Sequence, residues 1–154
     1  MKDKQNFFSI VFLIHVFVFY SSCEFLSPRA PYIISIPKME IGGYEDYYKY
    51  AGIECSFYNT SSKTIEKMEI DFSLFDPITK KPLSMSGPHF SVVCRETINS
   101  GEEIDLGISL DSFIHYIPDS PFLIDNFSVR RIYYTDKTTW EDPFGIFAVS
   151  NYGD

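Results

Sequence analysis

Two neighbouring runs of alternating apolar and polar residues, within residues 52–82, constrain the fold of this chain more than any other feature. Successive side chains of a β-strand point to opposite faces, so an alternating run gives a strand one apolar face, whereas a helix would scatter the same residues. The apolar rows are Ile53, Cys55 and Phe57 in the first run and Met68, Ile70, Phe72 and Leu74 in the second. Turn-forming residues 59–64 separate the runs, and the sequence therefore predicts a β-hairpin with both rows in one core.

The remaining chain repeats this pattern of short strands and turns. Turn signals recur about every 8 to 12 residues, and the 18% aromatic content favours packed β structure. A strand predicted over residues 122–134 changes parity near Arg130 and Arg131, which indicates a β-bulge. With 154 residues the chain has room for one domain and a short appendage. We predict an all-β sandwich of about seven strands over residues 32–154.

The N-terminal segment has the order of an export signal. Lys2 and Lys4 precede a largely apolar run over residues 7–20. A bilayer-spanning helix needs about 20 apolar residues, so this run fits a secretory signal peptide better than a transmembrane helix. We therefore expect residues 1–22 to be removed on export.

Cys23 indicates how the exported chain is held. Small residues before a cysteine at the end of an apolar run resemble the lipobox of bacterial lipoproteins, although Tyr20 stands where that family prefers an aliphatic residue. The resemblance implies a lipid, typically palmitate, on Cys23, a tether over residues 23–31, and a membrane-anchored place on the exported side of the cell envelope, periplasmic or surface. Plain secretion and an uncleaved anchor are the alternatives.

The charge of the chain argues against nucleic acid as a partner. The net charge is −8, and removing Lys2, Lys4 and Asp3 with the signal changes it to −9. Nucleic-acid binding needs clustered cationic residues, and here the adjacent basic pairs are Lys80-Lys81 and Arg130-Arg131. Solubility is the simplest role for the acidic surplus, and a preference for a divalent cation or a cationic partner is the alternative.

A short motif in the second alternating run carries a family resemblance. Residues 72–76, Phe-Ser-Leu-Phe-Asp, resemble the motif that names the FxLYD domains, bacterial immunoglobulin-like modules of exported proteins, with Phe75 in place of Tyr. Residues 98–102 and the hairpin over 132–140 are similar to turns of related domains of unknown function, with Lys137 in place of Gly. The resemblance covers roughly residues 48–142. It implies an immunoglobulin-like β-sandwich and supplies no catalytic residues.

The sequence gives no catalytic or metal signature. Hydrolase, metalloprotease, P-loop and Cys-x-x-Cys spacings are missing. His89 and His115 are the histidines left after the signal, and we expect both to be ordinary surface or half-buried residues. Acidic residues gather in two turns, but without the Asp/Asn ladder of a calcium loop. These are Glu102, Glu103 and Asp105 in one turn and Asp136, Glu141 and Asp142 in the other. We expect no enzyme, cofactor or metal.

Cys55 and Cys94 allow two interpretations. In an oxidising compartment they can form a disulfide bond, which would add about 3 to 4 kcal/mol by the loop-entropy estimate. Alternatively they are buried thiols that behave as small apolar residues.

The aromatic residues of two loops are the candidate binding patch. They are Tyr44, Tyr47, Tyr48, Tyr50 and Trp140. Tyrosine gives contact area at little entropic cost, although such rings also serve as a lid over a sandwich edge. The function expected first is a membrane-anchored, non-enzymatic lipoprotein for protein binding, adhesion or envelope assembly, with an unknown protein partner. The alternative is a secreted ligand-binding or inhibitor-like module that uses the tyrosine loop or the Trp140 hairpin.

Overall fold

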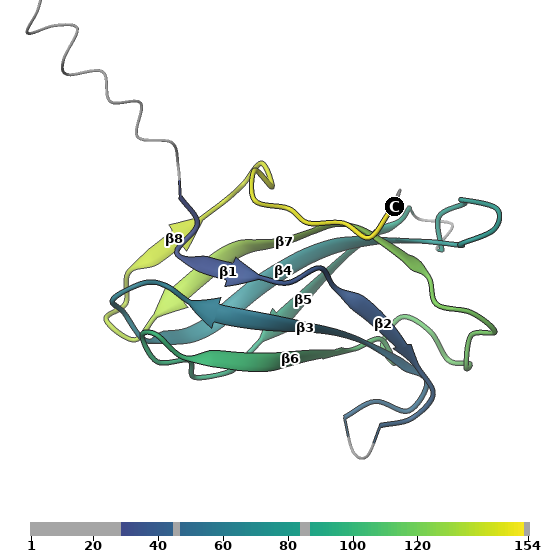
Figure 1. Cartoon of the computed structure of the whole chain (residues 1–154), viewed down its shortest axis with the longest axis horizontal. Helices are drawn as coiled ribbons and strands as arrows, with labels where there is room; N and C mark the ends of the chain where they lie inside the picture. The colour runs from purple at the N-terminus through teal and green to yellow at the C-terminus, as the bar shows by residue number, and fades with distance from the viewer. Residues whose placement is uncertain (1–28, 45–46, 84–86, 153–154) are drawn as a thin grey trace, which may run out of the picture.

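The computed structural model describes residues 29–44, 47–83 and 87–152, and its strands form two antiparallel sheets (Figure 1). The strands are β1 (Tyr32–Ile34), β2 (Lys38–Ile41), β3 (Ala51–Asn59), β4 (Ile65–Phe75), β5 (His89–Cys94), β6 (Glu103–Ser109), β7 (Leu123–Tyr134) and β8 (Thr139–Glu141). No helix occurs within these described residues. The all-β sandwich predicted from the sequence is confirmed, with eight strands instead of about seven.

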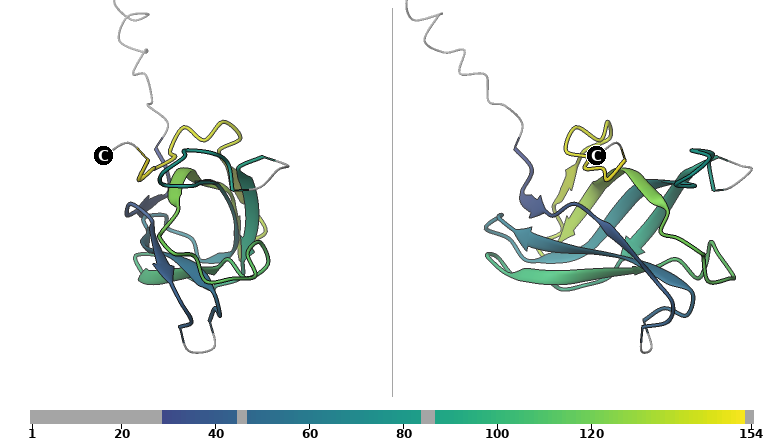
Figure 2. Two further views of the ribbon diagram at one scale, coloured as in Figure 1. Left: turned by 90° about the vertical axis from the view of Figure 1, so that its right-hand side faces the viewer. Right: turned by 45° about the vertical axis from the view of Figure 1, so that its right-hand side comes forward.

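The two sheets pack face to face around one apolar core (Figure 2). In the first sheet β3 is central: β1 and β2 pair with successive parts of one edge of β3, and β6 pairs with its other edge. The second sheet has the order β5-β4-β7-β8. Both alternating rows predicted to be apolar face the core, and they include the fully buried side chains of Phe57 and Phe72. The stacked ring of Phe127 completes this aromatic centre, 6.0 Å from the Phe72 ring.

The predicted hairpin between the two alternating runs is wrong. β3 and β4 follow one another in the chain but lie in different sheets, so their apolar rows face each other across the core and their backbones do not pair. An inward-facing row satisfies both arrangements, because alternation fixes which side of a strand is buried and not which strand lies beside it.

Asn59 holds the crossing from β3 to β4. Its side chain is fully buried. Its Nδ2 atom lies within hydrogen-bond distance of the carbonyl oxygens of Lys63, Ile98 and Asn99. Its Oδ1 atom accepts hydrogen bonds from the backbone N–H and the hydroxyl of Ser61. This one polar side chain therefore satisfies buried backbone groups of two turns, as a buried polar residue must.

Two local features of the sequence have clear structural counterparts, and one strand was missed. The β4–β7 register shifts between the pairs Glu69–Arg131 and Ile70–Val129, which leaves Arg130 as the extra residue and confirms the predicted bulge. The turn between β7 and β8 places Lys137 at φ 68°, the left-handed region that glycine adopts readily. The strand β2 was not predicted, because residues 38–50 were interpreted as a turn.

The interpretations that concern the N-terminus lie outside the described residues. They are the signal peptide over residues 1–22, lipid attachment at Cys23 and most of the tether over residues 23–31. Where the structure does describe the chain, no helix has the length and apolar character needed to cross a membrane.

Candidate binding groove

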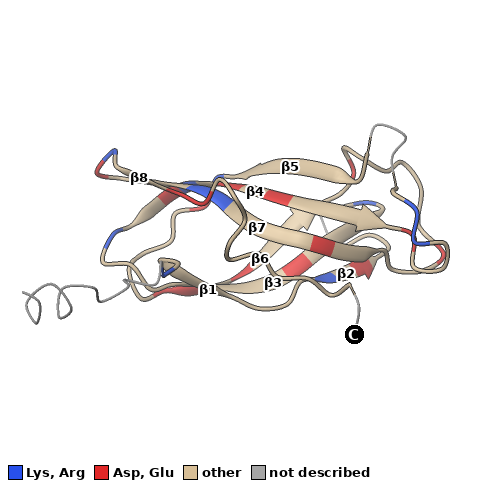
Figure 3. Ribbon diagram, turned by 90° about the horizontal axis from the view of Figure 1, so that it is seen from above, with Lys and Arg blue, Asp and Glu red and all other residues tan. Residues whose placement is uncertain are grey.

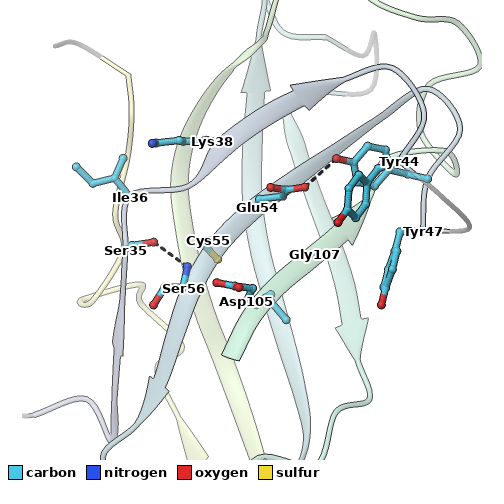
Figure 4. A pocket seen from close by; sticks show the side chains of 12 residues that line it. Ser35, Ile36, Lys38, Tyr44, Tyr47, Glu54, Cys55, Ser56, Asp105 and Gly107 are labelled. Atoms are coloured by element: carbon cyan, nitrogen blue, oxygen red, sulfur yellow. Dashed lines mark hydrogen bonds between the residues drawn. The ribbon is translucent and has the colours of Figure 1, made fainter. Parts of the chain in front are cut away.

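A groove of about 530 Å³ lies on the outer face of the first sheet (Figure 4). Its floor is formed by the outward side of β3 and β6, and its walls are the segment before β2 and the loop between β2 and β3. It is lined by Ser35, Ile36, Lys38, Tyr44, Tyr47, Tyr48, Glu54, Cys55, Ser56, Asp105, Leu106 and Gly107.

The loop between β2 and β3 forms the aromatic wall, which we call the tyrosine hairpin (residues 42–44 and 47–50). The hairpin is closed by backbone hydrogen bonds from Gly42 N to Tyr50 O and from Tyr44 N to Tyr48 O, both 2.9 Å. Gly42 turns the chain with φ 94°, which a glycine adopts without the steric strain of a side chain. The carboxylate of Asp111 accepts hydrogen bonds from the N–H groups of Lys49 (2.8 Å) and Tyr50 (3.0 Å). The base of the tyrosine hairpin is therefore held both by its own backbone hydrogen bonds and by the carboxylate of Asp111.

Tyr48 attaches the tyrosine hairpin to the sheet. Its side chain is only 6% exposed, and its ring lies so close to Gly52 that a Cβ atom there would come within 2.3 Å of Cε1. Its hydroxyl donates a hydrogen bond of 2.9 Å to Oε1 of Glu54. Burial, together with the hydrogen bond to Glu54, raises the pKa of Tyr48 above its ordinary value. Tyr48 therefore stays neutral and acts as scaffold.

Tyr44 and Tyr47 present their rings to solvent. They are 51% and 68% exposed, and their ring centroids lie 5.8 Å apart. Tyr44 also stacks on Tyr48, at 6.0 Å. Two exposed rings on a fixed base give an aromatic surface that a ligand can contact without ordering the loop first.

The floor of the groove is polar and leaves one gap. Glu54 of β3 is paired with Gly107 of β6, and Ser56 is paired with Asp105. The Ser56 N–H donates to Oγ of Ser35 (2.8 Å), which joins the floor to the opposite wall (Figure 4). Gly107 has no side chain, and a Cβ atom added there would have nothing within 4 Å. The floor is therefore open above β6 at this position.

The charge of the groove is predominantly negative. Glu54 and Asp105 belong to its lining, whereas Lys38 is the cationic lining residue. Among the described residues none of these three forms a salt bridge, although Lys38 and Glu54 are partners in the β2–β3 register. Neither carboxylate is therefore neutralised by one of these basic partners, although Oε1 of Glu54 accepts the Tyr48 hydrogen bond.

The structure brings together only part of the predicted aromatic patch. Tyr44, Tyr47 and Tyr48 share the groove. Tyr50 packs against the core, and Trp140 lies on β8 in the other sheet, with its ring 5.5 Å from that of Tyr32. Trp140 therefore belongs to the packing of the sandwich and not to the groove.

The cysteines lie on different sheets and are both free thiols. Cys55 is buried on β3, and Cys94 is half-buried on β5. Burial raises the pKa of Cys55 to about 12, with a contribution from the neighbouring Cys94 thiol. Burial also raises the pKa of Cys94 to about 11. Both groups are therefore protonated and weakly nucleophilic near neutral pH.

The remaining candidates do not gather into a reactive site. His89 is exposed on β5, and His115 is exposed between β6 and β7. Within residues 29–44, 47–83 and 87–152, no group of three or more His, Cys, Asp or Glu side chains could hold a metal ion. Asp142 is buried, where it accepts hydrogen bonds from the N–H groups of Ile146 and Phe147 at 3.0 Å each.

Sequence reasoning missed the floor of the groove. The outward parity of Glu54, Ser56, Asp105 and Gly107 was visible in the alternation. The pairing of β3 with β6, some fifty residues apart, was not, and this pairing assembles the floor.

Comparison with known proteins indicates the fold alone. No protein-family model and no curated protein matches the chain. A solved structure that resembles it is that of a hypothetical protein from Peptoclostridium difficile 630, with a TM-score of 0.54 and 11% sequence identity. The match covers 76% of this chain and 89% of that protein. At this identity the chain is similar to that protein in the path of its backbone.

Proposed function

We propose that this chain is an exported, lipid-anchored and non-enzymatic β-sandwich that binds a protein partner through the groove beside the tyrosine hairpin. The observation that carries the proposal is a concave surface with two exposed tyrosine rings on a fixed base. Aromatic residues dominate the energetics of protein interfaces. A preformed wall lowers the entropic cost of binding.

The anchor in this proposal comes from the sequence. The basic residues, apolar run and small residues before Cys23 support export and lipid attachment. The first described residues lead directly into β1, so a lipid at Cys23 would keep the sandwich close to the bilayer. A protein partner is then found on the exported side of the membrane or at the cell surface.

The arrangement of the reactive side chains supports a binding role over catalysis. Ser91, His89 and Asp71 meet on the outer face of the second sheet, which has the composition of a hydrolase triad. In such a triad the imidazole contacts the hydroxyl as a general base. Here the hydroxyl of Ser91 donates to Asp71 Oδ1, and His89 Nε2 lies 3.6 Å from Asp71 Oδ2. Both groups therefore contact the carboxylate, which is not the order of contacts in a triad.

Site-specific photocrosslinking in the cells that make the protein tests the partner. A benzophenone amino acid at position 47 is expected to give a covalent adduct with one protein. The matched control at position 116 replaces Tyr116, an exposed tyrosine outside the groove. Equal adducts at both positions, or none at position 47, would contradict a partner at the groove.

Metabolic labelling with palmitate, with and without Cys23→Ala, tests the anchor. We expect the label in the wild-type chain and its loss in the variant. An unlabelled wild-type chain in the medium would favour the alternative, a secreted ligand-binding or inhibitor-like module that uses the same tyrosine hairpin.

A further inference from the structure

One edge of the groove is also a free edge of the first sheet. β6 pairs with β3, and within the described residues it pairs with no other strand. Just beyond the two ends of β6, the Leu110 N–H donates to Ala51 O (3.0 Å) and the Asn59 N–H donates to Glu102 O (2.9 Å). Hydrogen-bonded positions alternate along an antiparallel pair, so the even-numbered residues of β6 bond to β3. Asp105 and Gly107 therefore direct their N–H and C=O groups away from β3, where an added strand would bond.

The gap at Gly107 connects this free edge to the centre of the groove. Strands of a sheet lie about 4.8 Å apart, so a strand added beside β6 would run roughly 10 Å from β3. An ordinary side chain at position 107 would stand between the added strand and Glu54. Because Gly107 has none, a long side chain of the added strand can cross β6 and reach the Glu54 carboxylate.

The lining selects the chemistry of that side chain. Among the described residues neither Glu54 nor Asp105 forms a salt bridge, although Oε1 of Glu54 accepts the Tyr48 hydrogen bond, and the rings of Tyr44 and Tyr47 are exposed beside them. Aromatic faces attract ammonium and guanidinium groups, and carboxylates form charge-assisted hydrogen bonds with the same groups. The geometry points to an extended segment of a partner protein that adds a strand to β6 and places an arginine or lysine side chain over Gly107 against Glu54. This inference rests on the proposed protein-binding function and names its mode.

The free edge of the second sheet at β5 lacks these features. β5 pairs with β4 on one side, and its outward row is His89, Ser91 and Val93. The carboxylates beside that row are already engaged, Asp71 by Ser91, His89 and Arg130, and Glu69 by Tyr133 and Arg131. An added strand there would meet a surface whose charges are satisfied. Of these two edges, the β6 edge is therefore the one that selects a basic side chain.

Selection from a random heptapeptide display library on the full chain in detergent tests the inference. We expect enriched peptides to carry one arginine or lysine flanked by β-branched residues, which favour an extended strand. Synthetic versions with that residue replaced by glutamine should bind about tenfold or more weakly, as expected for loss of a charge-assisted hydrogen bond.

Two variants of the chain locate the peptide. Gly107→Val fills the gap with a residue suited to strands and should weaken binding of the selected peptides about tenfold. Glu54→Gln should weaken binding of the basic peptide and leave its glutamine version unchanged. Val93→Ile, which enlarges the exposed row of the β5 edge, is the matched control and should change nothing.

Hydrogen exchange separates strand addition from a side-chain contact alone. In the free chain the amides of Asp105 and Gly107 should exchange rapidly, because they point to the free edge. Bound peptide should slow both. Selected peptides that lack a basic residue, or that leave these two amides unprotected, would overturn the inference. A crosslinked partner at position 47 would in that case still support the proposed function. A library without enrichment together with no crosslink overturns both.

Discussion

The outer faces of the two sheets differ in how far their charged residues are paired within the chain. On the second sheet the basic stretch of β7 lies beside acidic positions of the neighbouring strands (Figure 3). Arg131 lies 2.9 Å from Glu141 and 3.7 Å from Glu69, and its hydrogen bonds to Tyr133 and Glu141 raise its pKa above the ordinary value. Asp71 is likewise contacted by Ser91, His89 and Arg130. On this face every charge named here already has a partner within the chain.

On the outer face of the first sheet, Glu54 and Asp105 line a groove without a salt bridge among the described residues, beside the exposed rings of Tyr44 and Tyr47. Both faces belong to one sandwich with one core, so the difference does not follow from the fold. A face whose charges pair internally stabilises the sheet, although exposed pairs contribute little each. A face that keeps carboxylates free of salt bridges and aromatic rings exposed beside a cavity is suited to a ligand. Substitutions on the two faces should therefore change different properties.

The largest effect is expected where the groove depends on packing. Gly52→Val should lower the free energy of unfolding by about 1 to 3 kcal/mol, because the new side chain would overlap the ring of Tyr48 and displace the tyrosine hairpin. Gly107→Val is the matched control: it makes the same substitution in the adjacent strand, where the space is open, and should change stability by less than about 0.5 kcal/mol. Denaturant unfolding measures both. Equal losses would mean that the two glycines have the same role.

Asp71→Asn tests the paired face and should cost about 1 kcal/mol. Asp71 is buried, and its carboxylate joins Ser91, His89 and Arg130, whereas an asparagine side chain would present an amide donor to one of them. Arg130 and His89 remain hydrated, which limits the loss. Chemical unfolding gives the value, and peptide binding at the groove should stay at the wild-type level. Weaker binding would show that the two faces are coupled.

Glu54→Gln should give the opposite result. The side chain is exposed, and the Tyr48 hydroxyl can still donate to the amide oxygen of glutamine, so stability should change by less than about 0.5 kcal/mol. Its effect should appear in peptide binding alone. A loss of stability as large as that of Asp71→Asn would identify Glu54 as scaffold and remove the contrast between the faces.

The parts of this molecule that were predictable from the sequence are those that depend on neighbours in the chain. The inward rows of β3 and β4 follow from alternation, and the bulge at Arg130 follows from a break in that alternation. The same signal could not show that β3 and β4 lie in different sheets, because a row packs equally well beside or across from its partner.

The groove shows the same limit. The tyrosines of the wall were recognised because they are adjacent in the chain. Glu54 and Gly107 were not predicted as site residues because their pairing joins distant strands. The strand β2 was not predicted because it is short and buries only Met39. Long-range pairing is set by the packing of the whole core, which single-sequence periodicity does not report.

The smallest expected effect concerns a contact that belongs to neither face. Lys63 in the β3–β4 turn lies 2.8 Å from Asp136 in the β7–β8 turn, so it ties the ends of the two sheets together. The hydrogen bond from Lys63, with those from Thr138, lowers the pKa of Asp136 to about 2, against 3.8 for a free carboxyl. A lowered pKa means that this stabilisation is fully present above about pH 4 and is lost as the pH falls towards 2.

Thermal melting from pH 5 to pH 2 should therefore show the melting temperatures of the wild-type chain and of Asp136→Asn converging. Protonation of Asp136 at low pH removes the same negative charge that the substitution removes. Lys63→Gln should reproduce this behaviour, since it deletes the other partner of the same contact. A difference between wild type and variant that stays constant down to pH 2 would show that the carboxylate acts through its shape and not its charge. The ends of the sheets would then resemble the core more than either outer face.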